Sequence, residues 1–177
     1  AIVEMCLKDL SFDEHDVVLE PSAGSGSFLD LLPKQKRIGL DLEPAHSEVT
    51  KQDFFDFKPE DNKKYYVIGN PPFGKNSSLA VRFFNHSATF ADKIAFIVPR
   101  TFRKPSIINR LDQRFHLVRQ MILPLGSFHV PSGEPYEVPT VFQIWEKRVE
   151  SREKIKTVTE HEDFEFIKIN QNPSDAE

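Results

Sequence analysis

The sequence has one cysteine in 177 residues, so it cannot form an internal disulfide, and a metal site built from cysteine thiolates is not expected. No apolar run approaches the ~18 residues that a membrane span needs, and no charged-then-apolar leader opens the chain. The cysteine, Cys6, stands among apolar neighbours, which predicts a buried structural thiol. These absences favour an intracellular protein, cytoplasmic or, in a eukaryote, nuclear, with no metal ion and no membrane partner.

Apolar residues make up 39% of the chain and charged residues 28%, which is the composition of an ordinary globular domain. Residues 1–149 are long enough and apolar enough to form a single domain with its own core. Residues 150–177 are a charged tail. Its alternating patch, 164–169, predicts one edge strand, and residues 170–177 are predicted to be disordered.

Positive charge is concentrated in one part of the sequence, although the net charge of the chain is −4. Residues 71–120 contain nine Lys and Arg residues and two Asp residues, so this segment carries +7 and the remainder carries −11. A local basic surface can bind phosphates even when the whole protein is acidic. Scattered Lys and Arg are also common on solvated helix faces, and the sequence leaves both interpretations open.

Short apolar runs bounded by turn residues predict the strands of this chain. The expected strands are 17–19, 37–41, one ending near Asp53, 65–69, 94–98, 117–125 and 140–146. Helices are expected around them. They are 1–10, 27–32, 77–90 and 104–114. The segment between Asp41 and Asp53 leaves little room for a full helix, so an abbreviated crossover is expected there.

Strands that alternate with helices predict a doubly wound, mostly parallel sheet. The last two strands, 117–125 and 140–146, are joined by 126–139, a loop rich in proline and glycine. This pattern predicts an antiparallel hairpin at the sheet edge. The expected fold is therefore α/β and Rossmann-like: a doubly wound, mostly parallel sheet with an antiparallel edge hairpin.

The first predicted strand is followed by a loop of mostly small residues. The loop is Glu20-Pro21-Ser22-Ala23-Gly24-Ser25-Gly26. Glycines let the backbone turn tightly and let a ligand approach closely. A glycine-rich loop carries this meaning where it follows a strand and opens a helix. The third glycine of the dinucleotide-binding fingerprint would fall on Leu29, which argues against a nicotinamide or flavin site.

Acidic residues stand at the ends of the next two predicted strands. Asp41 ends one strand, where a carboxylate can accept hydrogen bonds from ribose hydroxyls. Asp53 stands near the end of the other, where it could accept from an adenine amino group while Phe54 covers the ring. Aspartates also form ordinary turns at such positions, so neither residue alone defines a site.

The tetrapeptide Asn70-Pro71-Pro72-Phe73 follows a predicted buried strand. Two prolines bar the backbone from continuing as strand or helix. The result is a stiff corner that displays an amide, backbone carbonyls and an aromatic ring at the carboxyl end of the strand, where ligands bind in open α/β sheets. Such a corner can accept hydrogen bonds from an amino group while the ring stacks on the plane that carries it. A proline-rich turn with no further role is the alternative.

Taken together, these strand-end residues resemble the class I S-adenosylmethionine-dependent methyltransferases, in particular those that modify adenine N6. The resemblance covers about residues 1–147. It extends to the late hairpin through Leu123-Pro124, Phe128 and Val138-Pro139-Thr140-Val141. It implies the class I methyltransferase fold and S-adenosylmethionine as cofactor. The cofactor-binding residues that it implies are Glu20, Pro21, Ser22, Ala23, Gly24, Gly26, Asp41, Leu42, Asp53 and Phe54.

The resemblance also implies a catalytic motif, Asn70, Pro71, Pro72 and Phe73. The Asn70 oxygen and the Pro71 carbonyl would accept the two N–H groups of an exocyclic adenine amine, and Phe73 would stack on the base. The substrate would be DNA or RNA, single-stranded or with the base flipped out of a duplex. Phe128 is a weaker candidate for an edge contact to the base, with hairpin packing as its alternative role.

The sequence departs from the family pattern in two respects that keep other functions open. The segment between Asp41 and Asp53 is short, and no target-recognition domain follows the hairpin, so a partner protein could supply target recognition. One alternative is a protein glutamine N5-methyltransferase, which uses a similar corner, usually with Tyr where this chain has Phe73. A second is a methyltransferase-like binding subunit that needs a partner chain. A dinucleotide-binding oxidoreductase is the most distant alternative.

Overall fold

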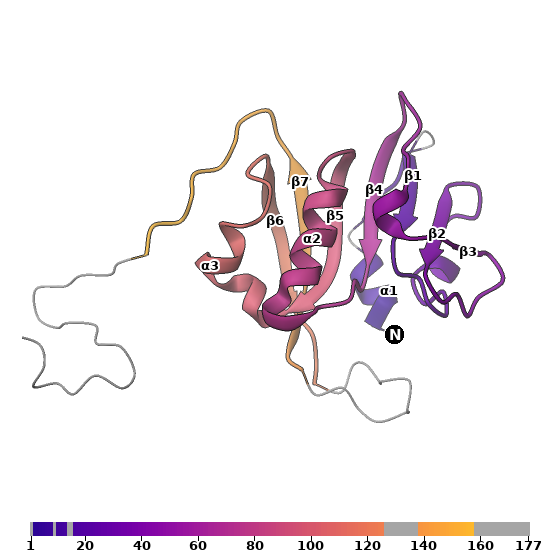
Figure 1. Ribbon diagram of the computed structural model, residues 1–177, viewed down its shortest axis with the longest axis horizontal. Helices are drawn as coiled ribbons and strands as arrows, with labels where there is room; N and C mark the ends of the chain where they lie inside the picture. Colours follow the sequence, from indigo (N-terminus) through magenta and orange to yellow (C-terminus); the bar gives the residue numbers. More distant parts are fainter. Residues whose placement is uncertain (1, 9, 14–15, 126–137, 158–177) are drawn as a thin grey trace, which may run out of the picture.

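A seven-stranded sheet forms the centre of the protein (Figure 1), in a computed structural model that describes residues 2–8, 10–13, 16–125 and 138–157. The strand order is β3-β2-β1-β4-β5-β7-β6. The strands are β1 (Asp16–Glu20), β2 (Arg37–Asp41), β3 (Val49–Lys51), β4 (Lys64–Gly69), β5 (Ala91–Pro99), β6 (Phe115–Ile122) and β7 (Thr140–Lys147). The first five strands pair in parallel, and β7 pairs antiparallel with both β5 and β6. The predicted mostly parallel sheet with an antiparallel edge hairpin is confirmed.

Few helices accompany this sheet. The α-helices are α1 (Ile2–Leu7), α2 (Ser78–Ser87) and α3 (Pro105–Ile108). The short 3₁₀ helices are η1 (Leu29–Leu31), η2 (Phe54–Asp56), η3 (Lys75–Ser77) and η4 (Arg100–Arg103). The crossover from β2 to β3 contains only turns and bends, as its length predicted. No helix within the described ranges is long and apolar enough to cross a membrane.

The two faces of the sheet pack against different partners because successive strand residues point to opposite sides. On one face, Leu19, Val67 and Phe96 pack with α2 residues such as Phe84. On the other, their strand neighbours pack with α1, where Cys6 is only 1% exposed. Burial raises the pKa of Cys6 to about 12, so the predicted buried structural thiol is confirmed.

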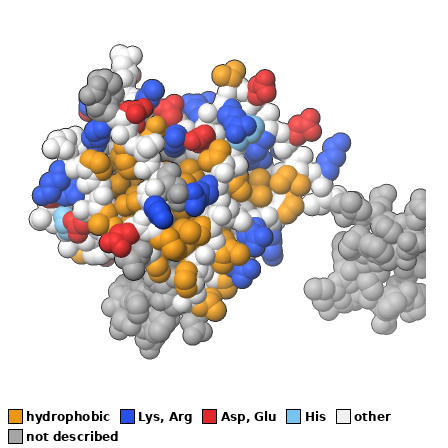
Figure 2. All heavy atoms as spheres, turned by 180° about the vertical axis from the view of Figure 1, so that it is seen from behind, with side chains coloured by type: hydrophobic (Ala, Val, Ile, Leu, Met, Phe, Trp, Pro, Cys, Tyr) orange, Lys and Arg blue, Asp and Glu red, His pale blue; other side chains and the backbone are white. Residues whose placement is uncertain are grey.

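Hydrophobic side chains remain visible on the rear face of the molecule (Figure 2). Among the described residues, α1 is the only α-helix in the core cluster on its side of the sheet. The edge strand β6 contributes exposed apolar residues, with Ile122 55% exposed and Val118 41% exposed.

Several predicted elements are shorter in the structure. The helix expected over 104–114 is reduced to α3, because the chain turns at Asn109 to make long-range contacts described below. The helix expected over 27–32 is only the 3₁₀ turn η1, which ends before Pro33. The strand expected to end near Asp53 stops at Lys51, and Asp53 instead caps η2.

The described part of the tail, 150–157, packs against α3 and the start of β6. The Arg152 guanidinium donates to the carbonyl oxygens of Ile108, Leu111 and Phe115 at 2.5, 2.9 and 3.1 Å. The guanidinium also lies 5.8 Å from the centre of the Trp145 ring. These contacts satisfy carbonyls at the end of a short helix. The edge strand predicted at 164–169 and the disorder predicted at 170–177 lie outside the described residues.

Candidate functional site

The site predicted from the sequence lies where the strand order reverses. The chain runs from β1 outward to β2 and β3 and then returns to β4 on the other side of β1. The carboxyl ends of β1 and β4 therefore diverge at a switch point, which is where open α/β sheets bind ligands. Across this gap, the Ser22 hydroxyl donates to the Asn70 carbonyl oxygen at 3.2 Å, so the two strand-end loops are in direct contact.

The loop after β1 is held against the end of β2 by Asp41. The Gly24 N–H donates to Asp41 Oδ2 at 2.7 Å, and the Glu43 N–H donates to Asp41 Oδ1 at 2.8 Å. Gly24 has a φ of +49°, a conformation that favours glycine. A carboxylate offers about four acceptor positions, so Asp41 can fix the loop and still accept from a ligand hydroxyl. Gly26 closes the turn through its N–H, which donates to the Ala23 carbonyl at 2.7 Å.

Glu20 is a buried acid at the base of this loop, with 2% of its surface exposed. Its Oε2 accepts the Leu29 N–H at 2.8 Å. Burial raises the pKa of Glu20 to about 8, although hydrogen bonds from the Leu29 and Phe28 backbones act in the opposite direction. The acid thus titrates near neutral pH, beside a loop that reaches the Asn70 corner.

A cavity of about 450 Å³ opens beside this loop. Glu20, Ser22 and Gly24 line it from one side and Asn70 from another, and Ile2 and Val3 of α1 complete the wall. No sequence pattern indicates that α1 reaches the site, because the apolar residues of α1 predict only an amphipathic helix.

The corner after β4 presents a buried acceptor that has no partner. Asn70 Oδ1 is buried and accepts no hydrogen bond from any described residue. A buried, unsatisfied amide oxygen costs about 1–3 kcal/mol, and such groups cluster at functional sites. Pro71 is buried, Pro72 is exposed, and Phe73 is partly exposed. The corner therefore combines a fixed backbone with an acceptor that no described residue satisfies.

A second cavity, of about 280 Å³, lies on the other side of the same loops. Pro21, Ser22, Asp41 and Leu42 line it together with Asp53, Phe54 and Pro72. Four further lining residues were not predicted from the sequence: Gln52, Phe55, Leu79 and Phe83. Leu79 and Phe83 are four residues apart on α2, a spacing that places them on one helix face. This spacing is the one feature of the sequence that could have indicated that both residues line the same cavity.

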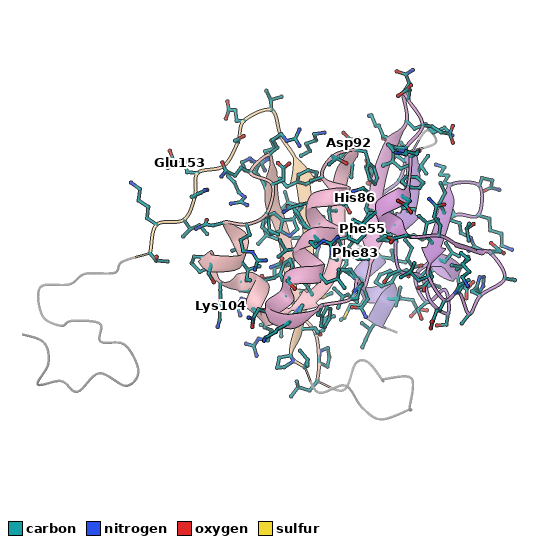
Figure 3. All side chains as sticks on the ribbon, viewed as in Figure 1. Phe55, Phe83, His86, Asp92, Lys104 and Glu153 are labelled. Atoms are coloured by element: carbon teal, nitrogen blue, oxygen red, sulfur yellow. The ribbon has the colours of Figure 1, made fainter. Side chains whose placement is uncertain are left out.

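Phe54 belongs to an aromatic cluster beneath this cavity. It is 2% exposed, and its ring centre lies 5.1 Å from that of Phe83 and 4.7 Å from that of His86. Figure 3 shows Phe55, Phe83 and His86 close together. Burial among these rings lowers the pKa of His86. The Phe54 ring is thus packed mainly into the core, while Asp53 is exposed and accepts the Phe55 N–H at 2.9 Å.

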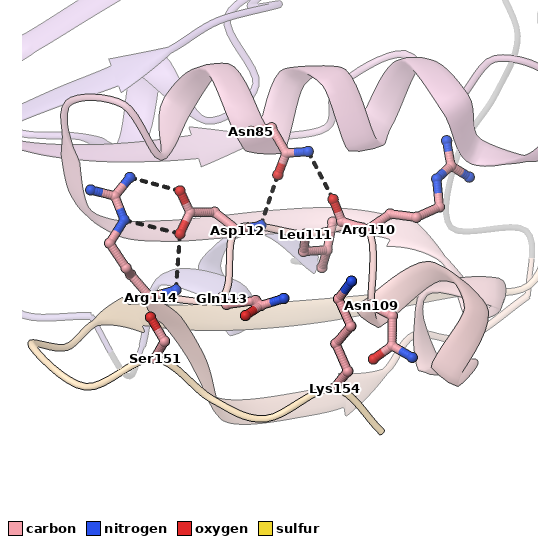
Figure 4. Close-up of a pocket in the computed structure, with 9 residues that line it drawn as sticks. All are labelled: Asn85, Asn109, Arg110, Leu111, Asp112, Gln113, Arg114, Ser151 and Lys154. Carbon is pink, nitrogen blue, oxygen red and sulfur yellow. Dashed lines mark hydrogen bonds and ion pairs between the residues drawn. The ribbon is translucent and has the colours of Figure 1, made fainter. Parts of the chain in front are cut away.

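A third cavity, of about 540 Å³, is larger but lies away from these loops (Figure 4). It is lined by the turn from Asn109 to Arg114, with Asn85, Ser151 and Lys154. Asn85 holds this turn by accepting the Asp112 N–H and donating to the Arg110 carbonyl, both at 2.9 Å. Since β6 starts at Phe115, opposite Lys147 of β7, the turn lies at the other end of the sheet from Asn70. We therefore assign it a structural role.

Most of the predicted site residues line two cavities that share Ser22, whereas Gly26, Pro71 and Phe73 line neither. The loop 20–26, Asp41 and Leu42, Asp53 and Phe54, and the corner 70–73 lie at the same edge of the sheet. Phe128, the weaker candidate, lies outside the described residues.

Comparison with known proteins gives structural likeness only. A scan of family models and a search of curated proteins gave no match. Among solved structures, the 23S rRNA methyltransferase ErmE matches with a TM-score of 0.59 and 13% identity, over 85% of this chain and 68% of that one. The magnesium protoporphyrin IX methyltransferase ChlM from Synechocystis PCC 6803, with bound SAM, matches with a TM-score of 0.57 and 14% identity. The match covers 83% of this chain and 76% of that one.

A third similar structure is the E. cuniculi Mtq2-Trm112 complex, responsible for the methylation of the termination factor eRF1. It matches with a TM-score of 0.55 and 15% identity, over 83% of this chain and 93% of that one. The named substrates of these three proteins are an RNA, a porphyrin and a protein, so the fold does not specify the acceptor. At such low identity the likeness establishes architecture alone, and the chain has the class I methyltransferase fold.

Proposed function

We propose that this protein is an S-adenosylmethionine-dependent methyltransferase that methylates the exocyclic N6 amine of adenine in nucleic acid. The observation that carries this proposal is the buried, unpartnered Asn70 Oδ1, at a proline-fixed corner beside the loop that the two cavities share. An acceptor held in this way matches a ligand that brings its own N–H donor.

The residues around the two cavities fit the proposed cofactor. The loop from Glu20 to Gly26 would hold the amino-acid part of the cofactor in the cavity of about 450 Å³, where Gly24 leaves space that a side chain would fill. Asp41 would accept from the ribose hydroxyls. In the cavity of about 280 Å³, Asp53 would accept from the amino group of the cofactor's adenine, and Leu42 and Phe54 would supply apolar contact.

The cofactor's sulfonium supplies an electrophilic methyl carbon and a good leaving group. The chain's own residues position the acceptor. Asn70 Oδ1 and the Pro71 carbonyl accept the two N–H groups of the amine, and Phe73 stacks on the base. As the amine nitrogen bonds to the methyl carbon, the carbon–sulfur bond breaks and the nitrogen loses one proton to solvent. The two acceptors stabilise the positive charge that develops on the nitrogen.

The test is mass spectrometry of nucleosides after RNA and DNA are incubated with the protein and methyl-labelled cofactor. We expect labelled N6-methyladenosine or its deoxy form. Asn70→Ala should lower the rate by about 100-fold or more, on the scale of losing one preorganised transition-state contact. Cofactor affinity, measured by calorimetry, should be nearly unchanged. Undiminished turnover in the variant would contradict the role of Asn70.

A second candidate function is methylation of a protein glutamine at N5. The likeness to the Mtq2-Trm112 complex supports it, because a side-chain amide presents a planar NH2 group similar to that of adenine. The same likeness supports a partner chain that completes target recognition, with or without catalysis by this chain. Incubating labelled cofactor with nucleic acid and, separately, with a release-factor-like protein separates the two activities. Label in the protein alone would favour the second candidate.

A further inference from the structure

The loops after β4 and β5 lie side by side at the edge that carries Asn70. Gly69 pairs with Phe96, so the two strands end close to one another. Beyond the strands, the Ser77 and Thr101 hydroxyls hydrogen-bond at 2.8 Å. This contact joins η3 directly to η4.

The first of these loops has a fixed shape. Gly74, Asn76 and Ser77 all have φ values between +52° and +68°. A Cβ on Gly74 would lie 2.8 Å from the Leu79 Cβ, so the turn requires glycine at this position. The Phe73 carbonyl accepts the N–H groups of Leu79 and Ala80 at 3.2 and 3.3 Å. The loop therefore holds the exposed Lys75 next to the catalytic corner.

Four cations are exposed on these two loops: Lys75, Arg100, Arg103 and Lys104. The sequence from 70 to 104 contains one acid, Asp92, which lies at the start of β5 and at the opposite end of the sheet from Lys104 (Figure 3). None of the four forms an ion pair with any residue that the structure describes. Within the described part of the chain they therefore form a positive edge without acidic partners.

We propose that Lys75, Arg100, Arg103 and Lys104 bind the backbone phosphates of the nucleic-acid strand that carries the target base. This inference rests on the proposed function and deepens it, since it assigns the residues that hold the polymer. Phosphate contacts fix the register of a strand without reading its sequence. The ligand class is a single-stranded polynucleotide, and the bond between Ser77 and Thr101 holds the two halves of the surface together.

Fluorescence anisotropy with a labelled, adenine-containing 12-nucleotide RNA, and with the DNA of the same sequence, tests this surface at several salt concentrations. Each phosphate contact contributes about −0.7 to the slope of log K against log salt for single strands. The double variant Arg103→Gln/Lys104→Gln should therefore make the slope shallower by about 1.4. The charge-preserving variant Arg103→Lys/Lys104→Arg should restore it.

The matched control is Arg110→Gln/Lys154→Gln, which removes one exposed Arg and one exposed Lys at the other end of the sheet. The control should keep the wild-type slope. Equal slopes in the two double variants, or no binding of either polynucleotide by the wild type, would overturn the proposal. RNA binding alone or DNA binding alone, with the expected difference between variants, supports it and identifies the polymer.

The binding readout separates this inference from the proposed function. Asn70→Ala should bind the oligonucleotide with the wild-type slope. If the salt slopes of the two double variants differ as expected but no adenine is methylated, the proposed phosphate-binding surface stands and the proposed reaction is wrong. If adenine is methylated but the salt slopes of the two double variants are equal, the proposed reaction stands and the proposed phosphate-binding surface is wrong.

Discussion

The two ends of the sheet differ in the ion pairs that their Lys and Arg side chains form. At the end where β6 begins, two cations have acidic partners: Arg114 contacts Asp112 at 2.7 Å and Lys93 contacts Glu146 at 2.9 Å. At the end that carries Asn70, the cations of η3 and η4 have no acidic partner among the described residues. The difference is that the first end contains ion pairs within the fold, whereas the four exposed cations of the second end have none with the described residues.

One ionisable group at each end of the sheet, Glu20 and the partly buried Arg152, sharpens this comparison. Glu20 is buried at the ligand end, where desolvation raises its pKa and disfavours its charged form. Arg152 lies at the other end and donates to the backbone carbonyls of Ile108, Leu111 and Phe115. At the ligand end the Asn70 oxygen has no partner among the described residues, whereas at the tail end the Arg152 guanidinium makes three hydrogen bonds and leaves only Nη1 without one.

The largest effect on stability is expected for Glu20→Gln at high pH. The pKa of Glu20 is raised in the folded state, so its contribution to stability is fully present below the unfolded pKa and is lost as pH rises to about 8. The loss is at most about 5 kcal/mol. Chemical denaturation should show near-equal stabilities at pH 5 and a more stable variant at pH 9. Equal stabilities at both pH values would contradict the assignment.

Arg152→Ala should lower the free energy of unfolding by about 3 kcal/mol, since it removes three hydrogen bonds to backbone carbonyls and the contact with the Trp145 ring. Urea denaturation measures the change. Methyl transfer by the folded fraction should be unaffected, because Arg152 lies at the end away from Asn70. Arg152→Lys is the control and should recover only part of the loss, since an ammonium cannot reproduce the planar donor array. A loss of activity larger than the loss of folded protein would break the comparison.

Asp41→Ala should weaken cofactor affinity by about 10-fold, or about 1.4 kcal/mol. The substitution removes the proposed acceptor for ribose and frees the Gly24 N–H from its clamp. Calorimetric titration with S-adenosylmethionine measures the change. Asp41→Asn, which keeps one acceptor oxygen, should lie between the wild type and the alanine variant. Unchanged affinity in both variants would remove Asp41 from the site.

The smallest effect is expected for Asp112→Asn. The side chain of Arg114 lowers the pKa of Asp112, but Arg114 is 45% exposed and solvent screens the pair. Exposed ion pairs contribute about 0–1 kcal/mol. The variant should therefore lose less than about 1 kcal/mol in urea denaturation and keep full activity. A much larger loss would show that the cavity of Figure 4 depends on this pair.

Local pattern predicted most of the sheet and less of the helices. The strand predicted at 37–41 has those bounds in the structure, because a buried strand is read directly from its apolar run. The helix predicted over 104–114 failed because α3 ends at Ile108. There the Asn109 side chain exchanges two hydrogen bonds with the backbone of Ile155, at 2.9 Å each. A partner 46 residues away leaves no trace in the local sequence.

The sequence by itself determined the order of the strands along the chain and the residues that follow each one. In a parallel sheet those residues meet at one edge, so Gly24, Asp41, Asp53 and Asn70 could be assigned to one site without coordinates. Only the tertiary structure decided that Asn70 Oδ1 is buried without a partner, that Phe54 lies mostly in the core, and that Ser77 joins Thr101. The physical reason is that burial and hydrogen-bond satisfaction depend on which distant segments pack together.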